Sequence, residues 1–307
     1  MTIRVAAGDE LQRPATPLFV IVGPTASGKT EIALAVAEAV DAEIVSADSQ
    51  QVYRDADIAT AKPTPDERRR IPHHVIDFVE PTAQFTAAAF VANADRAIRD
   101  IAERGKRVVV AGGTGLYVRA LLRGLVALPP ANARLRAELA ARPLAELHAE
   151  LAALDRAAAQ RISPNDPIRL IRALEIADAT GRAPTKLLDA HRFATARYPH
   201  RIVAPRWNRA VLRDRIRARA EAMIARGLWD EVATLRRSLP PDAPLLRAIG
   251  FGDDAATLIR RTTAFAKRQE TWFRKEPGVE WVPMPAPLQS FIDRARAFFD
   301  GAPGERA

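Results

Sequence analysis

"LFVIVGPTASGKTEIALAVAEAV", residues 18–40, joins an apolar run to a glycine-bracketed loop and then to a helical pattern. The loop fits G-x-x-x-x-G-K-[ST], in which backbone N–H groups cradle phosphates, the lysine neutralises phosphate oxygens and the hydroxyl holds Mg²⁺. The strand, loop and helix occur in the order that this motif requires. The stretch therefore predicts a site for a diphosphate or triphosphate, with Mg²⁺ as cofactor and Thr30 as metal ligand, formed by Gly23, Pro24, Thr25, Ala26, Ser27, Gly28, Lys29 and Thr30.

Short β-branched runs alternate with helical patterns in the first third of the chain. The runs lie at 19–22, 42–46 and 107–111, and helices are expected from about Thr30 and from about Gly115. This alternation is typical of a parallel sheet with crossover helices. Ligands of such folds bind at the carboxyl ends of the strands, where the glycine-bracketed loop lies.

No convincing strand occurs between about residue 128 and residue 199. Apolar residues recur at helical spacing in its two longest segments, and Gly181 marks a helix stop. The segments are "RAELAARPLAELHAELAALDRAAAQRI" and "IRLIRALEIADATG". "RIVAP", 201–205, then predicts a strand that returns to the sheet, followed by a helix over about 209–225 and more helix to about 271. We expect an α/β protein: a P-loop NTPase-like core with a parallel sheet at 14–127 and 200–307, and a mostly helical insertion domain at 128–199.

The composition is strongly basic, with 46 Lys and Arg against 37 Asp and Glu, a net charge of +9 and a pI of about 10.5. This charge favours a polyanionic partner, although an alanine- and arginine-rich composition also reflects genome base composition. The absence of cysteine excludes disulfides, a thiolate nucleophile and a cysteine zinc site. We find no apolar run of membrane-spanning length and no secretory signal, so we expect a cytoplasmic protein without membrane contact, acting as a monomer.

The acidic residue that an ATPase or GTPase places after a hydrophobic strand is missing here, because the best such strand, in "RVVVAGGTG", runs into glycines. Asp48 does follow the second strand, in "AEIVSADSQ", and is expected to point into the crevice at the sheet edge. Aspartates in such turns are equally often capping residues, so both interpretations stay open. Near the C-terminus, "FAKRQETWFRK" interleaves cations with aromatic residues, which suits nucleic acid but also an ordinary helix with one apolar face.

Taken together, these stretches resemble the tRNA dimethylallyltransferases, also called tRNA isopentenyltransferases. The resemblance extends in order from about residue 18 to about residue 283 and is carried by "GPTASGKT" (23–30), "SADSQQVYR" (46–54), "ATAKP" (59–63), "AGGTGLYVRALLRGL" (111–125), "RISPNDPIRLIRALE" (161–175), "RAIGFG" (247–252) and "AKRQETWFR" (266–274). It implies transfer of a dimethylallyl group from dimethylallyl diphosphate to the exocyclic amine of the tRNA adenosine immediately 3′ of the anticodon. The family resembles P-loop kinases, a nucleotide- and ATP-binding class, in fold, but it hydrolyses no nucleotide.

The resemblance also implies roles for individual residues. Asp48 is expected to be the catalytic base, Thr114 a substrate-orienting hydroxyl, and Arg219 an additional cation for the diphosphate bound by residues 25–30. Ala59 departs from the family, which commonly has glycine there, and Gln50 occupies a variable place; neither position touches the proposed chemistry. The tRNA-binding residues are expected to be Asp48, Ser49, Gln50, Gln51, Ile168, Arg169, Leu170, Ile171, Arg172, Arg247, Ala248, Ile249, Gly250, Phe251, Gly252, Lys267, Arg268, Gln269, Glu270, Thr271, Trp272, Phe273 and Arg274.

Two other functions remain open from the sequence. A P-loop small-molecule kinase would use Asp48 as base towards a hydroxyl and ATP as donor, and it would produce ADP. A nucleotide-gated RNA-binding module would bind RNA without turnover, and it would keep that affinity after Asp48→Ala.

Overall fold

The computed structural model describes residues 16–126, 128–191 and 196–301. The chain divides into two compact units, one formed by residues 1–122 and 196–307 and the other by residues 123–195. The sequence predicted a domain division at residues 128 and 199. None of the helices in the described part of the chain is long and apolar enough to cross a membrane.

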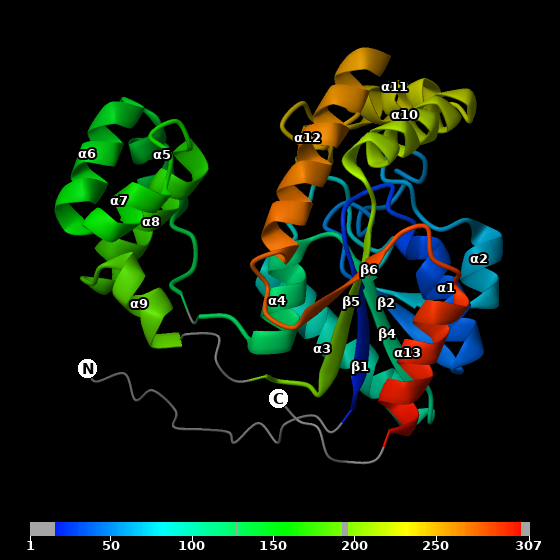
Figure 1. Ribbon diagram of the computed structural model, residues 1–307. Coiled ribbons are helices and arrows are strands. Elements are labelled where there is room, and N and C mark those ends of the chain that lie inside the picture. Colours follow the sequence, from blue (N-terminus) through cyan, green and yellow to red (C-terminus); the bar gives the residue numbers. More distant parts are fainter. Residues whose placement is uncertain (1–15, 127, 192–195, 302–307) are drawn as a thin grey trace. The chain divides into compact units, whose positions relative to one another are not determined.

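The larger unit is built on a parallel sheet in the order β3-β2-β4-β1-β5-β6 (Figure 1). The four strands predicted from the sequence are confirmed, and β3 and β6 were not predicted. β3 has only two residues, and β6, "VEWVP", lacks a continuous apolar run. The six strands are β1 Leu18–Val22, β2 Ala42–Ser46, β3 His73–His74, β4 Arg107–Gly112, β5 His200–Arg206 and β6 Val279–Pro283.

Helices cover both faces of the sheet because each strand points alternate side chains to opposite faces. Phe19 and Ile21 of β1 pack in one core with α1 (Lys29–Ala39) and α13 (Gln289–Asp300). Leu18, Val20 and Val22 pack in a second core with α3 (Ala87–Glu103) and α4 (Gly115–Arg123). The predicted crossover arrangement is therefore confirmed.

Three long helices continue from the carboxyl end of β5, and Figure 1 shows them gathered beyond that end of the strands. They are α10 (Arg209–Ala225), α11 (Leu228–Ser238) and α12 (Ala255–Phe273), with a short helix α2 (Pro65–Arg70) and a 3-10 turn (Pro244–Arg247) elsewhere in the unit. Leu212 and Ile216 of α10 and Ala266 of α12 form an apolar cluster with Ala26 of the phosphate-binding loop. This cluster places α10 and α12 directly against the loop.

All secondary-structure elements in the described residues of the smaller unit are helices. Leu139, Leu147, Leu151, Leu170 and Leu174 form its core, which explains the helical spacing of leucines in the sequence. The longest helix ends at Gly181, whose left-handed φ of 63° is the conformation that favours glycine at this position. The helices are α5 (Ala133–Ala140), α6 (Leu144–Leu154), α7 (Arg156–Arg161), α8 (Pro167–Thr180) and α9 (Pro184–His191).

Candidate functional site

The phosphate-binding loop connects β1 to α1, as the sequence predicted. Gly23 has a φ of 145° and Gly28, the N-cap of α1, has a φ of 92°, values that side chains beyond glycine rarely tolerate. Ala26 also has a positive φ, of 61°, in the same loop. Because the first N–H groups of a helix have no partner within the helix, the start of α1 presents donors and the positive end of its dipole to an anion.

Lys29 shares the site with Arg219 from α10 and with Asp48. Burial, and to a smaller extent the Arg219 guanidinium, lower the pKa of Lys29 from 10.5 to about 7, and the Asp48 carboxylate opposes both effects. Burial also lowers the pKa of Arg219, again opposed by Asp48. In this structure the Lys29 Nζ donates a hydrogen bond of 2.6 Å to the Pro24 carbonyl. The site therefore holds two desolvated cations facing one carboxylate, an arrangement that an anionic ligand would stabilise.

Asp48 lies in the turn that follows β2 and lines the cavity described below. Its Oδ1 accepts hydrogen bonds from the Gln50 amide at 2.8 Å and the Gln51 amide at 3.3 Å. No described residue hydrogen-bonds to Oδ2. The two interpretations left open by the sequence are thus compatible, because one oxygen caps the turn while the other is available as a proton acceptor.

Thr114 joins the loop after β4 to the Asp48 turn. Its amide donates to the Ala47 carbonyl at 3.1 Å, and its Oγ1 accepts from the Ser49 amide at 2.9 Å. The hydroxyl also donates to the Ser49 Oγ at 3.3 Å. In this structure the Thr114 hydroxyl orients the residues beside Asp48, and its predicted contact with substrate stays a prediction.

A cavity of about 390 Å³ lies at the carboxyl edge of the sheet, within the larger unit. Its polar wall includes Thr25, Lys29, Thr30, Asp48 and Arg219. Its apolar wall comes mainly from the helices beyond the sheet and includes Ile216, Met223, Ile249, Leu258 and Phe265. A lining with both charged and apolar residues fits a ligand with a phosphate group and a short hydrocarbon part.

Arginines add further positive charge to the cavity lining. Arg247 and Arg268 line it and are exposed. Arg261 also lines it, and its guanidinium bonds both carboxylate oxygens of Asp253 at 2.8 and 2.9 Å. Because Asp253 Oδ2 accepts the Gly250 amide at 2.9 Å, this pair also fixes the loop at 247–252.

The outer side of the phosphate-binding loop is held by two residues that sequence reasoning missed. Trp207 donates its indole N–H to the Ser27 carbonyl at 2.9 Å, and Arg215 donates its Nε–H to the Ala26 carbonyl at 2.9 Å. The Arg215 guanidinium lies over the Trp207 ring, 4.5 Å from its centre. Arg215 precedes Arg219 by one helical turn on α10, so their i, i+4 spacing was a signal available in the sequence.

The loop residues predicted to bind phosphate differ in their hydrogen-bond partners. The Thr25 amide is already occupied, because it donates to Gln269 Oε1 at 2.8 Å, and Pro24 has no N–H. Thr25 itself lines the cavity, so its predicted role in binding the diphosphate stays a prediction. Ser27 Oγ is buried and has no hydrogen-bond partner among the described residues, so it is an unsatisfied polar atom inside the loop.

Thr30 is exposed at the start of α1 and lines the cavity, together with the oxygen-bearing side chains of Ser46 and Asp48. Magnesium prefers such oxygen donors and is usually held by one or two protein groups plus phosphates and water. No cluster of three or more His, Cys, Asp or Glu that could hold a metal occurs among the described residues. This donor set fits a magnesium ion that depends on a phosphate ligand.

Several residues predicted to bind tRNA have buried side chains in this structure, and their contact with tRNA stays a prediction. Leu170 belongs to the core of the smaller unit, Phe251 and Phe273 belong to a core of the larger one, and Gln269 is buried between loops. The side chains of Leu170, Phe251 and Phe273 pack in these cores, whereas Gln269 also lines the cavity. Gly250 is buried as well.

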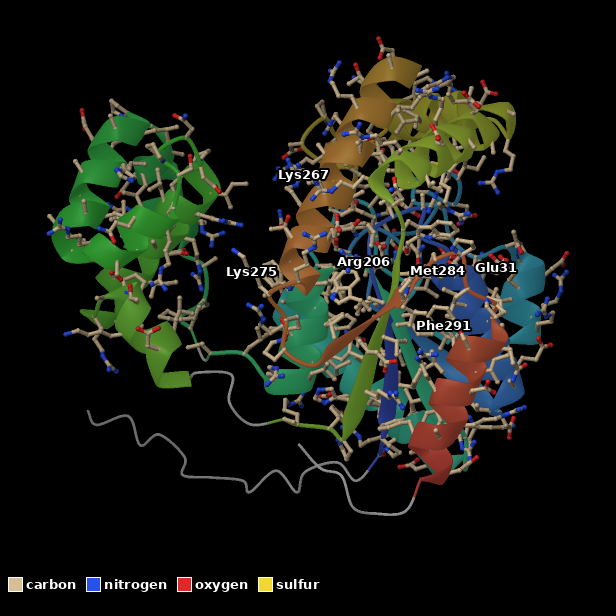
Figure 2. All side chains as sticks on the ribbon, viewed as in Figure 1. Glu31, Arg206, Lys267, Lys275, Met284 and Phe291 are labelled. Atoms are coloured by element: carbon tan, nitrogen blue, oxygen red, sulfur yellow. The ribbon has the colours of Figure 1, made fainter. Side chains whose placement is uncertain are left out.

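Other members of the same prediction are accessible and stay candidates for tRNA. Ile168 is 80% exposed, an unusual exposure for isoleucine. Arg172 already has partners within the protein, because its guanidinium donates hydrogen bonds to Glu175 at 2.5 Å and to the Pro129 carbonyl at 2.9 Å. Figure 2 shows Lys267 on α12 and Lys275 just beyond the end of that helix, both exposed. The remaining exposed members are Arg169, Arg247, Gly252, Arg268, Thr271 and Arg274.

Comparison with known proteins finds one matching family model and similar proteins that share one name. The family model "IPP transferase" matches residues 51–276. The tRNA dimethylallyltransferase of Geobacter metallireducens is 43% identical over 302 residues, covering 92% of this chain and 98% of that protein. The protein of the same name from Anaeromyxobacter sp. (strain Fw109-5) is 49% identical over 287 residues, covering 87% and 95%.

Solved structures give the same result. The full-length tRNA isopentenylpyrophosphate transferase from Bacillus halodurans has a TM-score of 0.68 at 36% identity, covering 93% of this chain and 96% of that one. A eukaryotic dimethylallyltransferase, captured in crystallographic snapshots acting on tRNA, has a TM-score of 0.82 at 25% identity, covering 95% of this chain and 81% of that one.

Proposed function

This chain belongs to the IPP transferase family, and we propose that it transfers a dimethylallyl group from dimethylallyl diphosphate to the N6 amine of the tRNA adenosine immediately 3′ of the anticodon, releasing diphosphate. The observation that carries the proposal is the joint position of Lys29, Arg219 and Asp48 on one cavity with an apolar wall. These groups match an anionic leaving group, a proton acceptor and a hydrocarbon chain.

The donor would bind with its diphosphate on the phosphate-binding loop. Breaking the allylic carbon–oxygen bond builds negative charge on the diphosphate, and Lys29, Arg219 and the first amides of α1 would stabilise that charge. The two cations already act on each other across this site, since Arg219 lowers the pKa of Lys29. Electrostatic stabilisation of developing charge is usually the largest catalytic contribution. Thr30 would hold Mg²⁺, which supplies further positive charge to the leaving group when it is bound.

The acceptor would be an adenine taken out of its stack, because its exocyclic amine is unreachable inside the anticodon loop. Base flipping of this kind costs a few kcal/mol, which binding to the rest of the RNA must supply. Asp48 Oδ2 would accept the proton that the amine loses as the new nitrogen–carbon bond forms. The exposed cations of α12 and of the smaller unit would supply contacts to tRNA phosphates.

A small-molecule kinase is not favoured, because β4 ends in Gly112 and places no acidic residue after the hydrophobic strand. We also propose that the protein works in the cytoplasm as a monomer, where unmodified tRNA is available to it.

The test is mass spectrometry of unmodified tRNA incubated with the protein, Mg²⁺ and dimethylallyl diphosphate. We expect a C5H8 mass gain on the nucleoside 3′ of the anticodon, and none with Asp48→Asn at matched times. Parallel reactions with ATP test the alternative: ADP formation without prenylated nucleoside would replace this proposal with a kinase.

A further inference from the structure

Gln269, on α12, is a buried polar side chain that links two loops of the site. Its Oε1 accepts a hydrogen bond from the Thr25 amide at 2.8 Å, and its Nε2 donates to the Gly113 carbonyl at 3.0 Å. Thr25 belongs to the phosphate-binding loop after β1, and Gly113 follows β4. A carboxamide suits this place because it carries an acceptor and a donor on one rigid plane.

The glycines after β4 allow this contact. A Cβ on Gly113 would clash with Gln269 Nε2, and a Cβ on Gly115 would clash with the ring of Trp272. Gln269 and Trp272 are three residues apart, so they lie on one face of α12. The helix therefore rests directly on the backbone of the loop at 113–115, and the carboxamide is held on two sides.

The same link continues to the catalytic base. Gly113 precedes Thr114, whose Oγ1 accepts the Ser49 amide at 2.9 Å beside Asp48. On the other side, Thr25 precedes Lys29 in a single short loop. One side chain thus stands between the loop assigned to the leaving group and the turn that carries the base.

We propose that Gln269 is a positioning residue that holds the phosphate-binding loop and the Asp48 turn at a fixed spacing, so that the allylic carbon and the attacking amine meet in line. This inference rests on the proposed function and adds a second role to the predicted tRNA-binding role of Gln269. Misplacing reacting groups by about 1 Å can cost about 10²-fold in rate, which sets the size of the expected effect.

The first test separates turnover from binding. Gln269→Leu should lower kcat about 10²-fold while KM for tRNA and for dimethylallyl diphosphate each change by less than about threefold. Gln289→Leu is the matched control, since Gln289 is exposed on α13 and bonds only Asp293 among the described residues. An unchanged kcat, or a loss carried entirely by KM, would overturn the proposal.

A second variant, Gln269→Glu, tests the hydrogen bonds of this side chain, because the pH dependence of its kcat would not change if Gln269 only filled space. In Gln269→Glu the introduced carboxyl, when protonated, can still accept from the Thr25 amide and donate to the Gly113 carbonyl, whereas the carboxylate cannot donate. The ratio of variant to parent kcat should therefore rise as pH falls, because burial raises the pKa of the introduced carboxyl. Lys29, Arg219 and Asp48, the charged residues on the polar wall of the cavity, are present in both proteins. A ratio that is flat with pH contradicts the proposal.

A third measurement does not need activity. Amide hydrogen exchange should show lost protection in both the 23–30 and 111–118 segments of Gln269→Leu. The segment 57–62 should keep its protection, because Glu231 accepts its amides at Asp57, Ile58 and Ala59. If the parent protein transfers no prenyl group, the proposed function is wrong, but hydrogen exchange still tests whether Gln269 holds the two loops together. Unchanged exchange in both segments would show that it does not.

Discussion

Binding of the diphosphate donor should take up a proton at Lys29, and its affinity should fall as pH rises above 7. Burial and Arg219 hold the Lys29 pKa at about 7 in the ligand-free protein. A bound diphosphate favours the ammonium form, so it raises this pKa and binding is linked to protonation. The neutral amine offers no charge to the phosphate oxygens.

The expected loss of donor affinity with rising pH follows from the Lys29 pKa of about 7. If only the protonated form binds well, the dissociation constant grows by one plus the ratio of neutral to charged lysine, a factor of about two at pH 7, about ten at pH 8 and about a hundred at pH 9. Between pH 7 and pH 9 the affinity should therefore fall about 50-fold. Arg219 stays charged throughout, because a guanidinium is not deprotonated in proteins over this pH range.

Isothermal titration with dimethylallyl diphosphate and Mg²⁺, in buffers of different ionisation enthalpy, measures both the affinity and the protons taken up. About half a proton should be taken up at pH 7, approaching one at pH 8–9. Lys29→Arg is the control, because a guanidinium remains charged across this range and should flatten the profile. The ligand's own ionisation and that of His73, which also lines the cavity, are common to both proteins. An affinity that is flat in the parent, or equally steep in Lys29→Arg, refutes the reasoning.

Three further predictions concern the other parts of the site. Asp48→Asn should lower turnover about 10²–10⁴-fold, the usual contribution of a general base, with tRNA affinity in a gel-shift assay unchanged. Arg219→Ala should raise KM for the donor, whereas Lys267→Ala should weaken tRNA binding and leave donor KM intact; the reverse pattern would exchange their roles. Arg169→Ala and Lys267→Ala should each reduce the salt dependence of tRNA affinity by a little under one unit of slope, and Arg96→Ala, on the exposed side of α3, should leave it unchanged.

Local patterns in the sequence were sufficient for the parts of the fold that local physics determines. β1, β2, β4 and β5 are apolar runs bounded by turns or helices, and α10 runs from Arg209 to Ala225 as its spacing indicated. β6 was missed because Glu280 and Pro283 interrupt its pattern. That strand is stabilised by pairing with β5, and such long-range pairing leaves little local signal.

The candidate site was predictable only where a motif names the residue. Lys29 and Asp48 follow from their places after β1 and β2. The link through Gln269 and the outer contact of Arg215 were not predictable, because each joins segments that are far apart in the sequence: residue 269 meets residue 25, and residue 215 meets residue 26. The residues of "AKRQETWFR" were compatible with a nucleic-acid surface or with an ordinary helix that has one apolar face, and neither interpretation shows which polar side chain faces inward.

Gly112 gives a physical reason why the phosphate-binding fold lacks its usual acidic residue here. A Cβ at this position would clash with the backbone carbonyl, carbonyl carbon and Cα of Ala47, the residue that precedes Asp48. The end of β4 therefore approaches the end of β2 so closely that no side chain fits between them. An acidic metal ligand at 112 would push the Asp48 turn away from the cavity. The same close approach lets the Thr114 amide reach the Ala47 carbonyl at 3.1 Å and fixes the turn. The sheet therefore has no carboxylate at the end of β4, and the Asp48 carboxylate after β2 lines the same cavity as Lys29. Asp48 is thus placed for the proton-accepting role that we propose for it.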